Sequence, residues 1–245
     1  MKRLDVLLNK DLKELTESEK ESIIAQIDKA NYLDQRHLNR IAAVGYNLAL
    51  QNSDNFDKET IAKLYNISLK SLDIRESDDF CTSQFSTNPS HLFFMVGYFA
   101  KILVERTKDE ETAEKGFRIL RNYANLTAKI NPHKSAFSVS LGADIGKALF
   151  ESTCSDIWGA RWYSGKRDSA EKTEKIDPLY SAHAFGFAGQ AAKEVSRKKR
   201  KPHFKTEAIE SYRKALEMFH EQKPNPKIKG LMKSLERELK FVCSL

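Results

Sequence analysis

The chain has 245 residues, of which 40% are hydrophobic and 31% are charged. This length is sufficient for a buried core, and the composition excludes an intrinsically disordered chain. Lys and Arg outnumber Asp and Glu by 41 to 34, for a net charge of +7, and the excess lies in the C-terminal part. Residues 1–100 carry 12 basic and 15 acidic residues, whereas residues 101–245 carry 29 and 19. A basic field of this kind attracts polyanions but does not define a fold.

The sequence predicts a cytoplasmic protein, or a nuclear one if the organism has a nucleus. The longest apolar run, residues 92–104, is interrupted by Lys101 and is shorter than the roughly 20 residues that a membrane-spanning helix needs. Cys81, Cys154 and Cys243 are odd in number and widely spaced, which is typical of a reducing compartment rather than of a disulfide framework. We therefore expect no membrane partner, and the sequence indicates no oligomeric state.

The N-terminal residues 1–33 are predicted to form short lead-in helices. Ser18 and Glu21 have the spacing of a capping box ahead of Ile23. A helical pair follows over residues 34–87, with one helix starting at Asp34 and its partner at about Asp57. The segment 80–87 is predicted to be a loop.

Four Asn-Pro or Asp-Pro dipeptides, at 88–89, 131–132, 177–178 and 225–226, mark the remainder of the chain. Asn or Asp at a helix N-cap accepts a hydrogen bond from a free backbone N–H, and proline is well suited to the first helical position. The four starts are separated by 43, 46 and 48 residues, about the length of two helices with their connections. They predict helical modules over 88–130, 131–176 and 177–224, and a terminal helix over 225–245 that caps the array.

The predicted fold class is therefore all-α. We expect a single domain over residues 1–245, built as an array (an α–α superhelix) of about nine to ten helices in antiparallel pairs. Gly142 and Gly146 lie in the interior of a predicted helix, where glycine costs up to about 1 kcal/mol relative to alanine. Another backbone is expected to approach closely there.

Two helices of this pattern resemble the halves of a tetratricopeptide repeat. The residues that carry the resemblance are Phe93, Val96, Gly97 and Ala100 in one helix, and Ala208, Tyr212 and Ala215 in another, with Pro132 and Pro224 near repeat ends. The resemblance concerns architecture. It implies stacked antiparallel helix pairs with a concave surface that often binds peptides or proteins, and it identifies no binding residue.

The first candidate site is a basic run at residues 197–201, in the predicted connection 196–203, together with two lysines close by. It comprises Lys193, Arg197, Lys198, Lys199, Arg200, Lys201 and Lys205. One interpretation is a solvated helix end and loop. The functional interpretation is contact with the phosphates of a polyanion, or a nuclear import signal.

A second candidate site is an aromatic and basic patch in residues 156–176. It comprises Trp158, Arg161, Trp162, Tyr163, Lys166 and Arg167. Tryptophans at a four-residue step are most often core anchors of a helix. Aromatic rings interleaved with Arg and Lys are also used to stack the bases of single-stranded nucleic acid.

The sequence contains no motif that indicates catalysis, a metal or a cofactor. The segment from Gly142 to Lys147 lacks the spacing of a phosphate-binding loop, and His220-Glu221 is not followed by the second histidine of a zinc protease. We therefore predict a non-catalytic adaptor that binds a protein partner without metal or cofactor. The alternative is an RNA-binding or single-stranded-DNA-binding protein that uses the basic C-terminal half.

Overall fold

The computed structural model describes residues 7, 10, 14–25, 27, 35–51, 54, 56–77, 89–223 and 225–244. Within these residues the regular structure is helical throughout, with ten α-helices and no strand, which confirms the all-α fold class. The helices divide between two compact units, residues 1–107 and residues 108–245. This division falls inside the module predicted over 88–130. The single array over residues 1–245 stays a prediction.

The first unit contains α2 (Glu17–Ile24), α3 (Gln35–Gln51), α4 (Lys58–Ser77) and α5 (Pro89–Thr107). The capping box predicted at Ser18 and Glu21 is wrong, because α2 begins two residues earlier. Thr16 is the N-cap, and the Glu19 carboxylate accepts a hydrogen bond from the Thr16 backbone N–H at 3.0 Å. Asp57 caps α4, as predicted: its carboxylate accepts the Thr60 backbone N–H at 2.7 Å. The starts predicted at Asp34 and Asn88, and the loop 80–87, lie outside the described residues.

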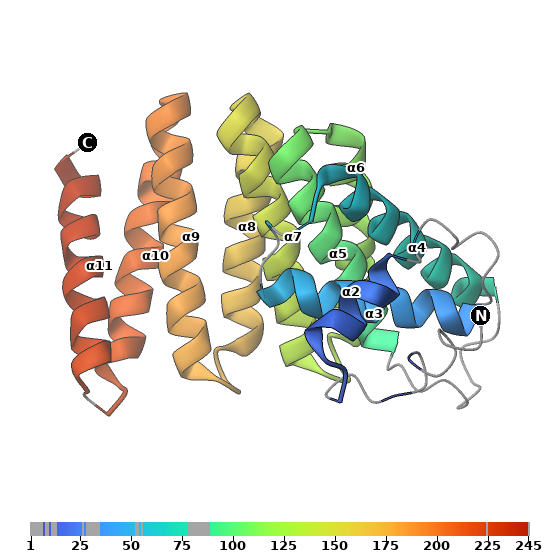
Figure 1. Cartoon of the computed structure of the whole chain (residues 1–245). Helices are drawn as coiled ribbons and strands as arrows, with labels where there is room; N and C mark the ends of the chain where they lie inside the picture. The colour runs from blue at the N-terminus through green and yellow to red at the C-terminus, as the bar shows by residue number, and fades with distance from the viewer. Residues whose placement is uncertain are drawn as a thin grey trace. The chain divides into compact units, whose positions relative to one another are not determined.

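The second unit contains α6 (Glu110–Thr127), α7 (Pro132–Thr153), α8 (Asp156–Thr173), α9 (Pro178–Lys199), α10 (Pro202–His220) and α11 (Pro226–Ser244). Each of these helices packs against the next in chain order, and α7 to α11 stand side by side as successive rods (Figure 1). The caps predicted at Asn131, Asp177 and Asn225 are confirmed, since each side chain accepts a backbone N–H three residues later at 2.9 to 3.0 Å.

This second unit has an internal period of 46 residues that is more regular than the dipeptide spacing. Lys108, Cys154 and Arg200 lie 46 residues apart and are the non-glycine residues with positive φ in the described chain, at 58°, 52° and 52°. The turns before α7 and α9 also match. The Ser135 hydroxyl donates to the Ala124 carbonyl at 2.8 Å, and the Ser181 hydroxyl donates to the Ala170 carbonyl at the same distance. Residues 108–153 and 154–199 therefore repeat one helical unit, and Arg200 opens the last helix pair at the same interval.

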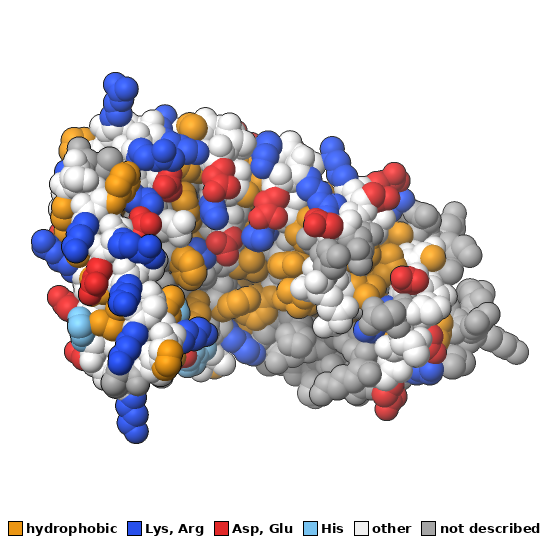
Figure 2. Space-filling model, turned by 60° about the vertical axis from the view of Figure 1, so that its left-hand side comes forward, with side chains coloured by type: hydrophobic (Ala, Val, Ile, Leu, Met, Phe, Trp, Pro, Cys, Tyr) orange, Lys and Arg blue, Asp and Glu red, His pale blue; other side chains and the backbone are white. Residues whose placement is uncertain are grey.

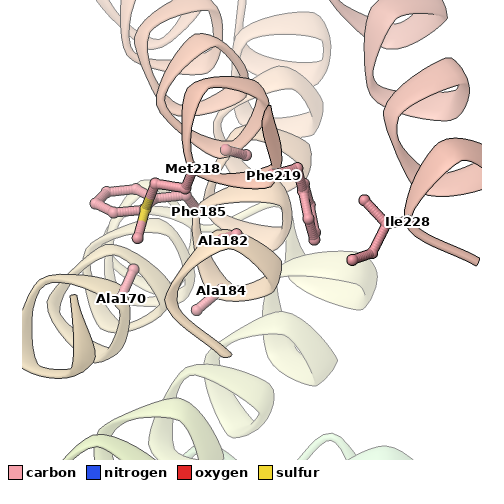
Figure 3. Close-up of a cluster of buried hydrophobic side chains, with 8 residues drawn as sticks. Ala170, Ala182, Ala184, Phe185, Met218, Phe219 and Ile228 are labelled. Atoms are coloured by element: carbon pink, nitrogen blue, oxygen red, sulfur yellow. The ribbon is translucent and has the colours of Figure 1, made fainter. Parts of the chain in front are cut away.

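Small residues allow these helices to approach closely. A Cβ on Gly146 would lie 3.1 Å from the Trp162 backbone nitrogen, so α8 passes directly over this position, as predicted. At Gly142 the neighbour is instead the Phe117 side chain, at 3.4 Å. Towards the C-terminal end, one buried cluster joins four helices (Figure 3), in which Ile228 of α11 points toward Phe219 of α10.

Candidate functional site

The aromatic and basic patch belongs to the core of the second unit. Trp158 and Trp162 are 1% and 4% exposed. Trp158 meets the Phe117 ring edge-on, and its indole N–H donates to the Glu110 carboxylate at 2.9 Å. The Arg161 guanidinium lies over both the Trp158 and Phe117 rings and forms an ion pair with Glu114. The two indole rings therefore fasten α8 to its neighbours, and neither presents a face on which a base could stack.

The other three residues of this patch have partners within the unit. Lys166 is 7% exposed, and its ammonium group pairs with Asp144 at 2.8 Å. Arg167 and the Tyr163 hydroxyl both bond to the Glu207 carboxylate of α10. Burial, followed by the hydrogen bond to Glu207, raises the pKa of Tyr163 to about 12. These contacts join α8 to α7 and α10.

Several members of the basic run have partners within the second unit, and three of them, Lys193, Lys199 and Lys201, pair with acids that are distant in sequence. Lys193 pairs with Glu238 of α11 at 2.7 Å, and Arg197 pairs with Glu194 at 2.8 Å. The ammonium group of Lys198 lies 5.2 Å from the centre of the Phe150 ring, and that of Lys205 donates to the Cys243 carbonyl at 3.4 Å.

The remaining members of the run form the turn between α9 and α10. Lys199 and Lys201 both bind the carboxylate of Asp156, whose pKa is lowered by the hydrogen bonds from Lys201 and then Lys199. Arg200 takes the left-handed conformation that ends α9. The run therefore has a structural role in this turn, which its sequence of like charges does not indicate.

A groove lies between α9 and α11 in the second unit, and residues of α10 also line it. Its volume is about 250 Å³. The residues that line it include His183, Phe187, Lys193, Tyr212, Leu231 and Leu235. Phe187 is 54% exposed, which is unusual for a phenylalanine in the middle of a helix. We refer to this feature as the α9/α11 groove.

The floor of the α9/α11 groove holds a buried tyrosine with an unsatisfied hydroxyl. Tyr212 is 1% exposed, and its hydroxyl has no hydrogen-bond partner within the described residues. Burial, and then the carboxylates of Glu238 and Glu194, raises the pKa of Tyr212. Its ring lies on the α9 backbone, because a Cβ on Gly189 would be 2.6 Å from the ring. Gly189 therefore allows close packing of Tyr212 on α9.

The opposite part of the groove is apolar. His183 meets the Phe219 ring edge-on with 5.1 Å between ring centres. Burial, followed by the charge of Lys227, lowers the pKa of His183 and so favours the neutral imidazole. The groove is therefore lined by both charged side chains, Lys193 and Glu238, and apolar ones that include Phe187.

A second depression, between α8 and α10, has a volume of about 430 Å³. It is lined mainly by charged side chains, and several of them pair with one another. Arg167 pairs with Glu171 at 2.9 Å, and Lys214 pairs with Glu174 at 2.7 Å. Phe185 lies at its base and is buried. The aromatic residue that lines this depression is buried, whereas Phe187 in the α9/α11 groove is exposed.

The outer face of α11 differs from the corresponding face of α9. α9 and α11 begin 48 residues apart, so Phe185, Ala188 and Gly189 of α9 correspond to Lys233, Glu236 and Arg237 of α11. The α9 residues are buried, whereas the α11 residues are exposed.

The exposed outer face of α11 is called the capping face and comprises Lys229, Lys233, Glu236, Arg237 and Lys240. Turned so that the α11 end comes forward, Figure 2 shows Lys and Arg gathered over this end.

The described residues contain no cluster of three or more His, Cys, Asp or Glu side chains that could hold a metal ion. None of the described helices has the length and apolar character required to cross a membrane.

Comparison with known proteins identifies no family. No protein-family model matches the chain, and no curated protein matches it. The de novo designed helical repeat protein DHR64 aligns with 96% of this chain and 97% of its own, at 15% identity and a TM-score of 0.40. The DHF119 filament aligns with 94% of this chain and 96% of its own, at 14% identity and a TM-score of 0.40. At these TM-scores the similarities support no inference, and the fold class rests on the helices themselves.

Proposed function

We propose that this chain is a non-catalytic binding protein, and that the α9/α11 groove receives an acidic amphipathic helix of a protein partner. The observation that carries the proposal is the exposure of Phe187, 54%, beside Leu231 and Leu235 on the opposite helix. Apolar side chains on both walls of a groove are suited to a helix that presents residues at i, i+3, i+4 and i+7. A peptide-binding surface is also what the tetratricopeptide resemblance implies.

The size of the groove favours side chains of a peptide over a separate small molecule. Pockets for drug-sized ligands have volumes of about 300–1,000 Å³ and bury most of the ligand. The α9/α11 groove, at about 250 Å³, lies below this range and is open along its length between two helices. It can accept a few side chains from one face of a helix.

The charges beside the groove favour an acidic partner. Lys227 precedes the groove-lining Leu231 by one helical turn, and its charge acts on the groove-lining His183. Lys227 forms no ion pair with an acid of the described residues and is exposed. Residues 200–245 carry 11 basic residues against 6 acidic ones. Complementary charge would speed association and select acidic sequences.

The experiment is a display selection on the full chain with a library of 18-residue amphipathic peptides whose polar positions are randomised. Enriched peptides are then measured by fluorescence anisotropy. We expect acidic sequences, and we expect Phe187→Ala to weaken their binding at least about tenfold, the effect typical of a central aromatic anchor. The matched control is Ile130→Ala, since Ile130 is an 85% exposed apolar residue outside the groove.

Two results would count against the proposal. One is an enriched peptide set that binds Phe187→Ala as tightly as the unsubstituted chain. The other is a selection that enriches basic peptides or none.

A second candidate function, nucleic-acid binding, is favoured by the capping face. Lys229, Lys233 and Arg237 follow one another at steps of about 6 Å along α11. None of them forms an ion pair with an acid of the described chain, in contrast to the basic run at 193–205. Single-stranded RNA or DNA would be held by phosphate contacts, without stacking on Trp158 or Trp162.

The test is the salt dependence of binding to single-stranded RNA. Replacement of Lys229, Lys233 and Arg237 by Gln should reduce the slope of log K against log salt by about 0.7 for each phosphate that the variant no longer binds. The matched control replaces Lys199 and Lys201 by Gln, which removes only ion-paired charges. If the control reduces the slope as much as the capping-face variant, the assignment to α11 is wrong.

A further inference from the structure

The turn between α6 and α7 and the turn between α8 and α9 have the same construction. The backbone N–H of Ile130 donates to the Thr127 carbonyl at 3.1 Å, and that of Ile176 donates to the Thr173 carbonyl at 3.0 Å. The sequences of the two turns also match, with Lys-Ile-Asn-Pro at 129–132 and Lys-Ile-Asp-Pro at 175–178. The same short segment therefore occurs twice, 46 residues apart.

Each of these turns exposes two large apolar side chains. Ile130 is 85% exposed, and Leu126, one helical turn before it, is 63% exposed. At the second turn Ile176 and Leu179 are 47% and 41% exposed. The hydrogen bonds that form the turns use backbone groups of the isoleucines, so the turns do not require an apolar side chain there. Single exposed apolar residues are common on protein surfaces, whereas grouped ones mark interaction sites.

The two turns lie at the same edge of the second unit. Helices α6 to α11 are joined by short turns and each packs against the next, so neighbouring helices are antiparallel and every second turn returns to one edge. In Figure 1 the turn between α8 and α9 and the turn between α10 and α11 are both at the lower ends of these helices. Since packed helix axes are about 10 Å apart, such turns are separated by roughly 20 Å.

This edge also carries lysines whose charge is not compensated. A lysine stands two residues before each of the helix caps Asn131, Asp177 and Asn225, namely Lys129, Lys175 and Lys223. All three lysines are exposed, and none forms an ion pair with an acid of the described residues. Segments 126–134, 172–180 and 221–229 together contain seven basic and three acidic residues. Of these acids, Glu174 pairs with Lys214 and Asp177 caps α9.

The opposite edge has a different character. Ile157 in the first turn of α8 is 63% exposed there, but the basic residues beside it are neutralised. Lys199 and Lys201 both pair with Asp156, the residue that precedes Ile157. Exposed isoleucine next to uncompensated lysine is therefore a feature of the edge formed by the α6–α7 and α8–α9 turns.

A planar anionic surface matches this edge. The exposed isoleucines come from separate turns, and neither of them lines the α9/α11 groove or the depression between α8 and α10. Side chains at the tips of parallel turns can reach one plane together, whereas a single docked peptide helix would need a continuous groove. Nucleic acid would use the lysines but would leave Ile130 and Ile176 in water.

We propose that this edge of the second unit docks on the surface of an anionic membrane. Ile130 and Ile176 enter the boundary between the lipid headgroups and the acyl chains. Lys129, Lys175 and Lys223 contact anionic headgroups. The expectation of no membrane partner was based on the lack of a spanning segment, and surface attachment requires none. The edge is separate from the α9/α11 groove, so this inference does not rest on the proposed function.

The experiment is co-sedimentation of the full chain with vesicles of phosphatidylcholine and phosphatidylserine, mixed at about three to one, and with vesicles of phosphatidylcholine alone. We expect binding to the anionic vesicles that weakens as salt is added. Ile130→Ser together with Ile176→Ser should lower the partition coefficient about tenfold. The matched control is Ile157→Ser together with Phe241→Ser, because these exposed residues lie toward the opposite edge, and it should bind like the unsubstituted chain.

A second pair of variants tests the lysines at constant net charge. Replacing Lys129, Lys175 and Lys223 by Gln should weaken binding to the anionic vesicles about fivefold for each lysine that contacts a headgroup. The control replaces Lys233, Arg237 and Lys240, which are exposed on the capping face, and it should weaken binding much less. Equal losses in the two variants would mean that vesicles adsorb to the overall positive charge, and would overturn the proposal.

Insertion itself is measured with Ile130→Trp and vesicles whose acyl chains carry bromine. We expect the added indole to be quenched, over the constant background of the buried Trp158 and Trp162. Unquenched emission, or full vesicle binding by the Ile130→Ser and Ile176→Ser variant, would overturn insertion and the proposal with it. So would a chain that binds no vesicles. If the groove-selected peptides then lose affinity for the same variant, the edge belongs to a protein partner.

Discussion

Lys199 at the end of α9 forms a 3.1 Å ion pair with Asp156 at the first turn of α8. Lys201 binds the same carboxylate from the start of the next helix. Asp156 of α8 thus binds both ends of the turn between α9 and α10. The basic residues of this turn resemble a polyanion-binding site in composition, but two of them connect the turn to α8.

Acidification should remove this connection. The hydrogen bonds from Lys201 and Lys199 lower the pKa of Asp156 in the folded chain. The ionised carboxylate therefore stabilises the fold fully above the ordinary Asp pKa of about 3.9. This stabilisation is lost as the pH falls through the lower pKa of the folded state. Urea midpoints of the unsubstituted chain and of Asp156→Asn should therefore differ at pH 6 and converge as the pH falls through the lowered pKa of Asp156. A difference independent of pH would contradict the ion-pair assignment.

Tryptophan fluorescence should report buried rings. Since Trp158 and Trp162 are 1% and 4% exposed, their emission should be blue-shifted and resistant to quenching by acrylamide. Titration with single-stranded RNA should leave the emission unchanged, even under conditions where anisotropy of a labelled RNA reports binding. Strong quenching by RNA would mean that the rings become accessible and that base stacking has to be reconsidered.

Substitution of Arg200 by Gly should stabilise the second unit. Arg200 has a φ of 52° at the end of α9. This left-handed conformation costs a residue with a side chain about 1 kcal/mol or more, whereas glycine adopts it at little cost. We expect a gain of up to about 1 kcal/mol in the free energy of unfolding for Arg200→Gly and no gain for Arg200→Ala. Cys154 has the same φ of 52° at the position 46 residues earlier, so Cys154→Gly should raise the free energy of unfolding by a similar amount.

The capping face should keep the array from extending. Replacing Lys233, Glu236 and Arg237 by Phe, Ala and Gly, the residues at the matching positions of α9, converts the capping face into a surface that another helix can cover. The expected result is concentration-dependent association in light scattering. Lys129→Phe, an exposed substitution in the turn between α6 and α7, serves as the control and should remain unassociated.

Gly230 provides a test of the helix packing beside the α9/α11 groove. It lies one residue before the groove-lining Leu231 in the interior of α11, and a Cβ at this position would meet nothing within 4 Å. Gly230→Ala should therefore stabilise the free chain by about 1 kcal/mol, because alanine is the better helix former. A free energy of unfolding no higher than that of the unsubstituted chain would contradict the open surroundings of Gly230 within α11.

Helix positions in this protein are local properties and are largely predictable. Asn131, Asp177 and Asn225 cap helices because the side chain and the following proline act within one turn, and no distant residue is needed. The same locality explains the error at α2, where Thr16 with Glu19 and Ser18 with Glu21 offer overlapping capping patterns. Only the tertiary environment selects between them.

The roles of charged and aromatic side chains were decided by residues far away in the sequence. Asp156 is 45 residues from Lys201, and Glu110 is 48 residues from Trp158, so these partners cannot be predicted from a local pattern. The sequence by itself determined an all-helical chain with its helix starts and a repeat length near 46 residues. Tertiary packing alone decided that the basic run is ion-paired and that Tyr212 and Phe187 meet in one groove, because helix stacking brings together side chains that the chain order separates.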